Sequence, residues 1–291
     1  MTVEFLPSFS ILAARYDAFI LDLWGVIHDG QKMYPGAKDC LERLRGSGKK
    51  IVLLSNAPRR ASVAAETLQR MGIRSGDYDA LITSGEAAYT CLVKGENFQP
   101  AGNRYIYIGL ERDRRLLEGL PFQETDDPQA AHFLLLSHSF YDNQPMSELE
   151  PLLARCLTVK LPALCVNPDS EVVRITGERV YCAGVLAEEY AAKGGQVTYF
   201  GKPHPVVYNM AFKTFVGIDK PRILAVGDNL ATDILGAHKN RVKSALVTGG
   251  ILRDELGEPG TDAYAARLKG LLAQAESMPD YALAAFNWQP L

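Results

Sequence analysis

The stretch AFILDLWGVIHDG, residues 18–30, contains the pattern that decides the fold. Its first four residues form an uninterrupted apolar run that ends at Asp22. A short apolar run of this kind, closed by a polar residue, is typical of a buried strand in a parallel sheet. We therefore expect a buried strand that ends at Asp22.

The chain on both sides of this strand alternates short apolar runs with amphipathic stretches. The elements expected after it are a helix over 37–48, a strand over 50–56, a helix opening at 55–58 and a strand over 79–85. Strands that alternate with helices pair in parallel through right-handed crossovers. The sequence therefore predicts an α/β fold with a doubly wound parallel sheet.

The same alternation returns in the last third of the chain. The expected elements there are strands at VTYFGK (197–202), RILAVGDN (222–229) and SALVTGG (244–250), with helices from about 205, from about 231 and over 263–275. Between the two blocks, RYIYIG, HFLLLS and ALCVN predict further strands with fewer polar residues at their ends. We expect a core of residues 1–84 and 196–291, with 85–195 inserted as an α/β cap domain.

Composition narrows the class of ligand. The 291 residues are 47% hydrophobic and 22% charged, with a formal net charge of -3 and no Lys/Arg-rich block. This balance argues against nucleic acid or an anionic membrane as the main partner, so a small molecule is the expected ligand. No apolar run approaches the roughly 20 residues that span a bilayer, and we expect a cytoplasmic location. The five cysteines include no CxxC pair, which indicates neither a disulfide framework nor a zinc site.

Polar side chains stand where the expected core strands end. These residues are Asp22, Ser55, Asn56, Lys202 and Asp228, with Asp233 one helical turn further on. In open α/β sheets, ligands bind at the carboxyl ends of the strands. Carboxylates that hold Mg²⁺, a lysine, a hydroxyl and helix N-termini are what phosphoryl transfer requires, and a carboxylate can also act as the nucleophile.

Four ordered motifs resemble those of the haloacid dehalogenase superfamily, class IIA, a branch of p-nitrophenyl-, sugar- and nucleotide-phosphatases. The motifs are DLWGVIHDG with PGA shortly after it, LLSNAP, GKPHP and GDNLATDI. NPD at 167–169 and AG at 183–184 also resemble the cap region of that branch. The resemblance spans nearly the whole chain and implies a magnesium-dependent phosphatase with a cap that selects a small phosphorylated metabolite. Caps in this branch can pair, so the resemblance also admits a homo-oligomer.

The resemblance assigns the nucleophile and the metal ligands. It implies that Asp22 attacks phosphorus and also binds Mg²⁺. Asp228 is then a direct ligand, Asp233 supports the metal through water or through a neighbouring group, and the backbone carbonyl of Trp24 is a further ligand.

The resemblance also assigns the residues that bind phosphate and substrate. Ser55 and the amides of Asn56 and Ala57 would grip the phosphoryl oxygens, helped by a helix N-terminus. Lys202 would pair with both the phosphoryl group and Asp22. Further residues expected to line the phosphate or the substrate are Trp24, Gly25, Asn167 and Asp169.

One position departs from the family pattern. The family carries Asp-x-Asp-Gly, whose second Asp protonates the leaving group and then activates water, whereas this chain has Asp22-Leu23-Trp24-Gly25. Indole can neither take nor give that proton at neutral pH, and loss of a general acid/base costs on the order of 10²–10⁴-fold in rate. Phenolic and acyl leaving groups would suffer least in the first step. His28 and Asp29 are the nearest candidates for a substitute.

Three alternatives stay open from the sequence. Trp24 favours a phosphate-binding or regulatory protein that kept the fold and lost efficient turnover, whereas Asp22, Lys202 and Asp228 favour an enzyme. Phosphonate cleavage would need a cap lysine between the first two motifs, where only a short helical segment stands. The Trp24 side chain either packs beneath the cap or stacks on a substrate ring.

Overall fold

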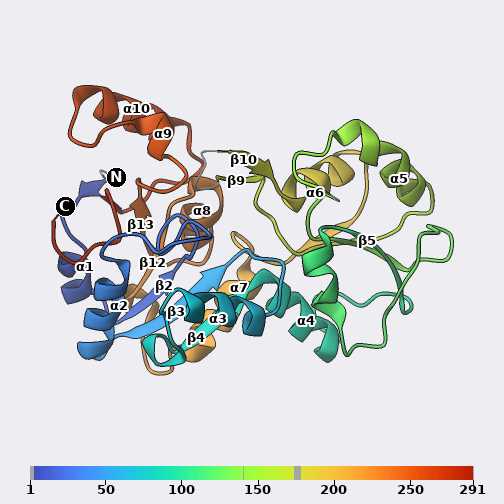
Figure 1. Cartoon of the computed structure of the whole chain (residues 1–291), viewed down its shortest axis with the longest axis horizontal. Helices are drawn as coiled ribbons and strands as arrows, with labels where there is room; N and C mark the ends of the chain where they lie inside the picture. The colour runs from blue at the N-terminus through green and yellow to red at the C-terminus, as the bar shows by residue number, and fades with distance from the viewer. Residues whose placement is uncertain (1–2, 140, 174–177, 291) are drawn as a thin grey trace.

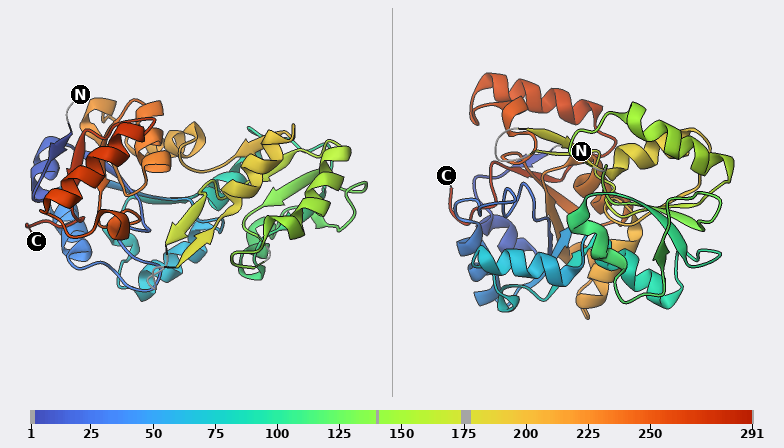
Figure 2. Two further views of the ribbon diagram at one scale, coloured as in Figure 1. Left: turned by 90° about the horizontal axis from the view of Figure 1, so that it is seen from above. Right: turned by 45° about the vertical axis from the view of Figure 1, so that its right-hand side comes forward.

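The computed structural model describes residues 3–139, 141–173 and 178–290 and contains two lobes, each built on its own parallel sheet (Figure 1). The first and last described residues, Val3 and Pro290, lie in the larger lobe, the core. The smaller lobe, the cap, lies beside it and stays distinct when the molecule is turned (Figure 2). The α/β class, the parallel core sheet and the inserted cap predicted from the sequence are confirmed.

The core sheet has seven strands. Their order across the sheet is β1 (Glu4–Phe5), β14 (Tyr281–Leu283), β13 (Lys243–Val247), β12 (Ile223–Gly227), β2 (Ala18–Leu21), β3 (Lys50–Ser55) and β4 (Ala80–Thr83). Every neighbouring pair is parallel. The carboxyl ends of β2, β3 and β12 therefore meet at one edge of the sheet.

Helices cover both faces of this sheet. They are α1 (Ser10–Arg15), α2 (Ala37–Gly46), α3 (Ala61–Arg70), α4 (Ser84–Lys94), α7 (Pro205–Thr214), α8 (Leu235–Lys239), α9 (Arg253–Leu256) and α10 (Asp262–Gln274), with 3₁₀ turns at η1 (Ser75–Asp77) and η3 (Lys220–Arg222). A π-helical segment, η4 (Leu230–Ile234), leads directly into α8.

Side-chain periodicity explains why these segments pack as they do. Along β2, Phe19 and Leu21 face one apolar layer and Ile20 faces the other, as the period of two in a strand requires. On α2, the buried side chains Cys40, Leu41 and Leu44 recur at helical spacing and face the layer of Phe19.

The cap sheet has five parallel strands. Their order is β11 (Val197–Tyr199), β8 (Ala163–Cys165), β7 (Phe133–Leu136), β5 (Arg104–Ile108) and β6 (Gln123–Glu124). The cap also contains η2 (Glu111–Leu117), α5 (Met146–Thr158), α6 (Ala183–Ala192) and an antiparallel hairpin of β9 (Glu171–Val173) and β10 (Arg179–Tyr181). This hairpin extends from the cap toward the core (Figures 1 and 2).

An apolar layer joins the lobes. One cluster of buried residues contains Ile20 and Val52 of the core sheet together with Phe133 and Leu135 of the cap sheet. Helix α4 contacts both α7 of the core and η2 of the cap. The cap therefore packs on the core through a shared hydrophobic interior.

Two expectations from the sequence are wrong in detail. Val197–Tyr199 was grouped with the core by the boundary at 195, but it pairs with Ala163–Cys165 at the edge of the cap sheet. The helix expected to open at 55–58 begins at Ala61, because Asn56 is held by hydrogen bonds to the backbone of Lys202. The first amide of α3 is instead capped by the carboxylate of Glu86, at 3.0 Å.

The five cysteines are buried and free. None of the helices in the part of the chain that the structure describes combines the length and the apolarity needed to cross a membrane.

Candidate functional site

A pocket of about 240 Å³ lies between the two lobes and is lined from both. Every residue assigned to the site from the sequence lines it: Asp22, Trp24, Gly25, Ser55, Asn56, Ala57, Asn167, Asp169, Lys202, Asp228 and Asp233. The strand ends of the core and the NPD turn of the cap have therefore brought the predicted residues together. Their chemical roles stay predictions.

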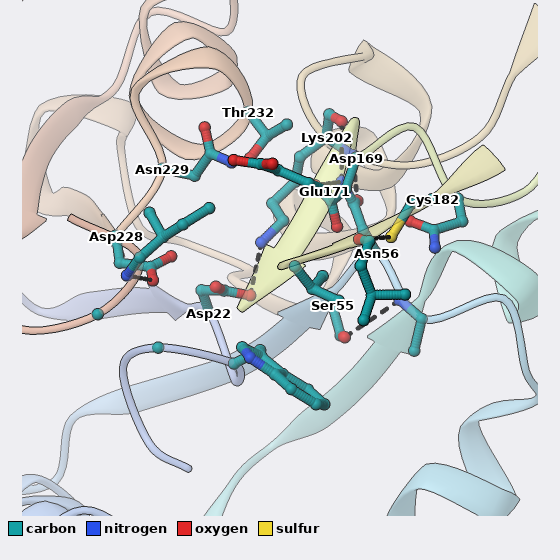
Figure 3. A pocket seen from close by; sticks show the side chains of 18 of the residues that line it. Asp22, Ser55, Asn56, Asp169, Glu171, Cys182, Lys202, Asp228, Asn229 and Thr232 are labelled. Carbon is teal, nitrogen blue, oxygen red and sulfur yellow. Dashed lines mark hydrogen bonds and ion pairs between the residues drawn. The ribbon is translucent and has the colours of Figure 1, made fainter. Parts of the chain in front are cut away.

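Lys202 is the centre of the polar end of the pocket (Figure 3). Its Nζ lies 2.6 Å from Asp22 Oδ1 and 2.8 Å from Asp233 Oδ1, and all three side chains are buried. Burial alone would lower the pKa of Lys202, but the neighbouring carboxylates more than offset it and the pKa is raised well above its ordinary value. The lysine therefore stays charged and holds Asp22 in one orientation.

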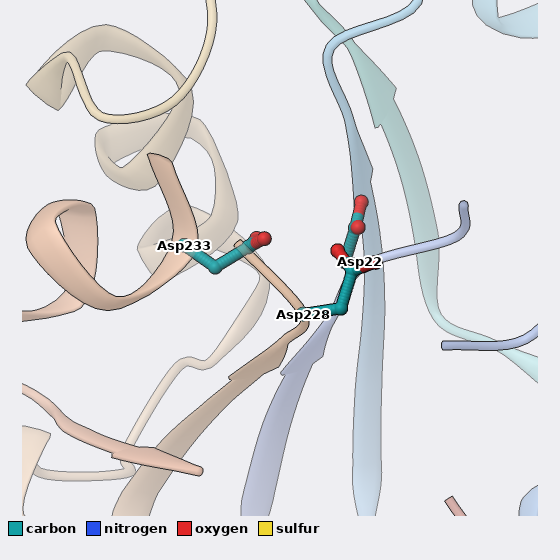
Figure 4. A group of neighbouring side chains, drawn as sticks. All are labelled: Asp22, Asp228 and Asp233. Atoms are coloured by element: carbon teal, nitrogen blue, oxygen red, sulfur yellow. The ribbon is translucent and has the colours of Figure 1, made fainter. Parts of the chain in front are cut away.

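Three buried carboxylates converge at this end (Figure 4). Asp22, Asp228 and Asp233 each offer an oxygen within 4.8 Å of the others. Asp228 Oδ2 also accepts the backbone N–H of Ile251 at 2.7 Å, and the Cα atoms of Gly25 and Gly250 press so closely on this side chain that neither position has room for a Cβ. The carboxylate of Asp228 is thus held firmly in place.

The electrostatics of this cluster favour a cation. Burial raises the pKa of Asp22, of Asp228 and of Asp233, the last to about 7, and repulsion from neighbouring carboxylates adds to each rise. Three carboxylates face a single ammonium, so negative charge is in excess. Hard oxygen ligands in this number suit Mg²⁺, and Asp22, Asp228 and Asp233 are the side chains that would hold it.

The loop after β2 fixes Trp24 against the pocket wall. Gly25 N–H donates to the carbonyl of His28 at 2.9 Å, and the indole lies edge-on to the His28 ring with 6.0 Å between centroids. Gly30 has φ +91°, and a Cβ there would lie 2.3 Å from Cη2 of the indole. The sequence DLWGVIHDG therefore folds so that the glycine makes room for the tryptophan.

Ser55 and Asn56 end β3 at the same edge. Ser55 Oγ accepts the N–H of Ala57 at 3.2 Å. Asn56 Oδ1 accepts the backbone N–H of Lys202 at 2.7 Å. Asn56 Nδ2 donates to the backbone carbonyl of Lys202 at 3.1 Å and to Asp169 Oδ1 at 2.8 Å. Burial raises the pKa of Asp169 to about 6. Asn56 thus connects the core strand, the lysine loop and the cap turn.

The two candidate substitutes for the missing acid/base differ in position. Asp29 lines the pocket, although its Oδ1 accepts the amides of Gln31 and Lys32 at 2.9 and 2.7 Å. His28 is buried outside the pocket lining, and its Nδ1 accepts the N–H of Gly30 at 3.0 Å. Geometry therefore favours Asp29 over His28.

Several pocket residues were not singled out from the sequence. They include Arg59, Arg112, Asp113, His138, Val172, Val180 and Thr232. Thr232 stands inside the GDNLATDI motif and could have been found from that context. Arg59 directly follows the LLSNAP motif, whereas the cap residues carry no local signal.

Two family models match the chain. A model of haloacid dehalogenase-like hydrolases covers residues 19–123, and a model of HAD-hydrolase-like domains covers residues 199–271. The chain belongs to the haloacid dehalogenase superfamily. The two models leave out 124–198, a segment that contains most of the cap, so the family signal is concentrated in the motifs of the core.

Relatives agree with this placement in the haloacid dehalogenase superfamily. Human chronophin is 28% identical over 253 residues, which are 83% of this chain and 84% of its own. A sugar-phosphatase of Bacillus subtilis (strain 168) is 24% identical, and the match covers 79% of this chain and 82% of that protein. A solved haloacid dehalogenase-like hydrolase from Brucella suis 1330 has a TM-score of 0.80 and 28% identity, with 98% of this chain and 99% of that chain covered. The resemblance to the haloacid dehalogenase superfamily recognised from the sequence is confirmed.

Proposed function

We propose that this member of the haloacid dehalogenase superfamily hydrolyses small phosphate monoesters through a phosphorylated Asp22, with Mg²⁺ as cofactor. The observation that carries the proposal is the contact of Lys202 Nζ with Asp22 Oδ1 at 2.6 Å inside a buried, carboxylate-rich pocket. The ammonium opposes the rise that burial causes in the pKa of Asp22, which favours the ionised nucleophile, and it would compensate charge on the phosphoryl oxygens.

The reaction divides into two displacements. In the first, a carboxylate oxygen of Asp22 bonds to phosphorus as the bond from phosphorus to the ester oxygen breaks, and the leaving group departs with that electron pair. In the second, the oxygen of a water molecule bonds to phosphorus and the Asp22 carboxylate leaves. The alkoxide takes up one proton from solvent to become the alcohol, and the attacking water gives one proton up to solvent. Phosphate and the alcohol are the products, and the enzyme is regenerated.

The residues around Asp22 fit the demands of these steps. Ser55 Oγ and the backbone of Asn56 and Ala57 stand beside the nucleophile to bind phosphoryl oxygens. Bound Mg²⁺ would supply positive charge against the phosphoryl group, held by Asp22, Asp228 and Asp233. The backbone carbonyl of Trp24 is proposed as a further ligand.

Trp24 limits the choice of leaving group. Because no carboxylate stands at position 24, esters of acidic alcohols such as phenols, and acyl phosphates, should react faster than esters of simple alkanols. Relatives whose names include sugar-phosphatase and phosphoglycolate phosphatase support a small phosphorylated metabolite, which we propose the protein meets in the cytoplasm.

The test is hydrolysis of p-nitrophenyl phosphate with Mg²⁺ by the wild type and by Asp22→Asn. We expect turnover in the wild type and none above the blank in Asp22→Asn. Asp262→Asn, an exposed carboxylate at the start of α10, is the matched control and should keep wild-type activity.

The rival function is binding of a phosphate ligand without efficient turnover, which the tryptophan at position 24 favours. Wild-type protein that binds Mg²⁺ and phosphate but releases no p-nitrophenol above the Asp22→Asn blank would replace the phosphatase proposal with this one.

A further inference from the structure

The cap-side end of the pocket contains a buried carboxylate that is ion-paired but has an oxygen without a hydrogen bond. Asp113, in η2, is 3% exposed and lines the pocket. Its Oδ1 lies 3.3 Å from Nη2 of Arg59, but this contact lacks hydrogen-bond geometry, and Oδ1 has no hydrogen-bond partner among the residues that the structure describes.

Two further buried polar atoms of pocket-lining residues also lack a hydrogen bond. Nε of Arg59 and Oδ1 of Asn167 are buried, and neither has a hydrogen-bond partner within the described part of the chain. Asn167 is 6% exposed, and both residues line the same pocket as Asp113. Buried polar groups are nearly always hydrogen-bonded, so three residues of one pocket lining whose hydrogen bonding is incomplete point to a polar ligand group that completes it.

The chemistry of these atoms selects the ligand group. Asp113 Oδ1 and Asn167 Oδ1 accept hydrogen bonds, whereas Arg59 Nε donates one. A hydroxyl group can donate and accept at once. A carboxylate on the ligand would face Asp113 with like charge, and the guanidinium of Arg112, 3.8 Å from Asp113 Oδ2, already compensates Asp113 alongside Arg59.

Arg59 is placed rigidly with respect to the proposed phosphate-binding loop. It lies three residues after Asn56, and its carbonyl accepts Thr83 Oγ1 at 2.6 Å. The carbonyls of Pro58 and Arg59 lie against Gly85, where a Cβ would be only 2.6 to 2.7 Å away. A group bound between Arg59 and Asp113 would therefore be held at a set position relative to phosphorus.

We propose that Asp113, Arg59 and Asn167 form a subsite that binds a hydroxyl on the leaving group of the ester, with Asp113 as its specificity-determining residue. This inference rests on the proposed phosphatase function. The subsite lies on both sides of the contact between the lobes, so a hydroxylated leaving group contacts the core through Arg59 and the cap through Asp113.

The experiment compares phosphate esters of equal carbon number that differ in their hydroxyls. The pairs are glycerol 3-phosphate with propyl phosphate, erythritol 4-phosphate with butyl phosphate, and sorbitol 6-phosphate with hexyl phosphate. Inhibition constants against p-nitrophenyl phosphate hydrolysis are measured for the wild type, Asp113→Ala, Asp113→Asn and Arg112→Gln. An inhibition constant reports binding even for an ester that turns over slowly.

We expect the hydroxylated member of at least one pair to bind the wild type about tenfold more tightly or better. This ratio should fall toward one in Asp113→Ala, recover in part in Asp113→Asn, which keeps an acceptor oxygen, and stay high in Arg112→Gln. A merely structural Asp113 would weaken both members of each pair equally, and that result, or a wild type without preference in any pair, overturns the subsite.

A second measurement distinguishes failure of the subsite from failure of the phosphatase proposal. If the wild type does not hydrolyse p-nitrophenyl phosphate, the same ester pairs are titrated calorimetrically into wild-type protein with Mg²⁺. A hydroxyl preference that disappears in Asp113→Ala then supports the subsite in a binding protein, and equal affinities for both members overturn it.

Discussion

Trp24 and Gly30 form a matched pair in the loop after β2, where Trp24 lines the pocket. The indole lies where a Cβ on Gly30 would otherwise project, and Gly30 adopts a positive φ that favours glycine. The loop therefore has room for the indole because position 30 is a glycine. The Trp24 side chain is half-buried and lines the pocket. Its effect on chemistry is that position 24 presents an apolar surface where the motif expected from the sequence resemblance has a carboxylate.

Replacing Trp24 by aspartate should restore proton transfer to the leaving group. We expect Trp24→Asp to raise kcat/KM for alkyl phosphates by about 10-fold to 100-fold, a part of the 10²–10⁴-fold effect of general acid/base groups. Hydrolysis of p-nitrophenyl phosphate should change less, since its leaving group needs no proton. Phosphate release from each ester measures both effects.

Trp24→Phe is the control for this prediction, since it changes the size of the aromatic group without adding a carboxylate. Equal gains in Trp24→Phe and Trp24→Asp would mean that space, rather than proton transfer, limits alkyl esters.

His28 makes stability depend on pH. Burial lowers the pKa of His28 from its ordinary value of 6.5 to about 4, and its Nδ1 must stay unprotonated to accept the N–H of Gly30. The folded state therefore binds fewer protons than the unfolded state between these values, and stability is lost as pH falls through this window. From pH 7.5 to pH 5 the loss from this residue is about 2 kcal/mol.

The measurement is urea unfolding of the wild type and of His28→Asn at both pH values. Asparagine can accept the Gly30 N–H through its oxygen but does not titrate. Between pH 7.5 and pH 5, the unfolding free energy of His28→Asn should therefore fall by about 2 kcal/mol less than that of the wild type. Parallel pH dependence in the two proteins would show that His28 is not buried in its neutral form.

At the scale of elements, the π-helical segment η4 positions Asp233. Asn229 caps this segment, with its Oδ1 accepting the N–H of Ala231 at 2.9 Å. Asp233 turns back over Gly227, where a Cβ would lie 2.0 Å from its Cγ, and reaches Lys202. The turn after β12 thus brings Asp228 and Asp233 together beside Asp22.

Removing the cap of η4 should loosen this turn. We expect Asn229→Ala to cost about 1 kcal/mol of unfolding free energy, the usual effect of losing a helix N-cap, and to weaken Mg²⁺ binding. Asn229→Ser keeps a capping oxygen and should recover most of both losses. Chemical denaturation and Mg²⁺ titration give the two quantities; unchanged values in Asn229→Ala would mean that the turn is held without this bond.

The elements that could be predicted from the sequence are those with strong local patterns. The strand ending at Asp22 and helix α2 follow from apolar runs and helical spacing within a few residues. The start of α3 was misplaced because the Asn56 amide binds Lys202, which lies 146 residues away in the chain. Val197–Tyr199 joined the cap sheet because its partner, Ala163–Cys165, offered a free edge that no local pattern reveals.

At the scale of the site, the motif residues could be predicted and the specificity residues could not. Motif residues such as Asp22 and Lys202 are placed by strand ends, which the sequence marks clearly. Asp113 and Arg59 meet only because η2 of the cap packs against the loop after β3. Their role depends on that tertiary contact, so the sequence predicts the chemistry of the pocket better than its selectivity.

For the whole molecule, the negative charge of the buried carboxylates in the pocket lowers the stability of the fold. Asp22, Asp228 and Asp233 lie buried around one ammonium, and the pKa of Asp228 is raised well above its ordinary value by burial and by the other two carboxylates. Forming these charges in the interior costs free energy, which a bound divalent cation would offset. Stability and cation binding are therefore coupled through this cluster.

Asp228→Asn should separate the two effects. Without metal, we expect the variant to be more stable than the wild type by about 1–3 kcal/mol, because a neutral amide replaces a carboxylate with a raised pKa and still accepts the N–H of Ile251. With Mg²⁺ at about 100 times its dissociation constant, the wild type should gain about 2.7 kcal/mol, while the variant should gain almost nothing.

Thermal unfolding in EDTA and in excess Mg²⁺ measures this crossover. Asp254→Asn, an exposed carboxylate that lines the pocket outside the cluster, is the control and should keep the full Mg²⁺-dependent rise in Tm. An Asp228→Asn protein that still gains stability from Mg²⁺ would place the cation elsewhere. A variant less stable than the wild type in EDTA would mean that Asp228 stabilises the fold through its hydrogen bond more than its charge destabilises it. The three buried carboxylates would then not lower the stability of the metal-free protein.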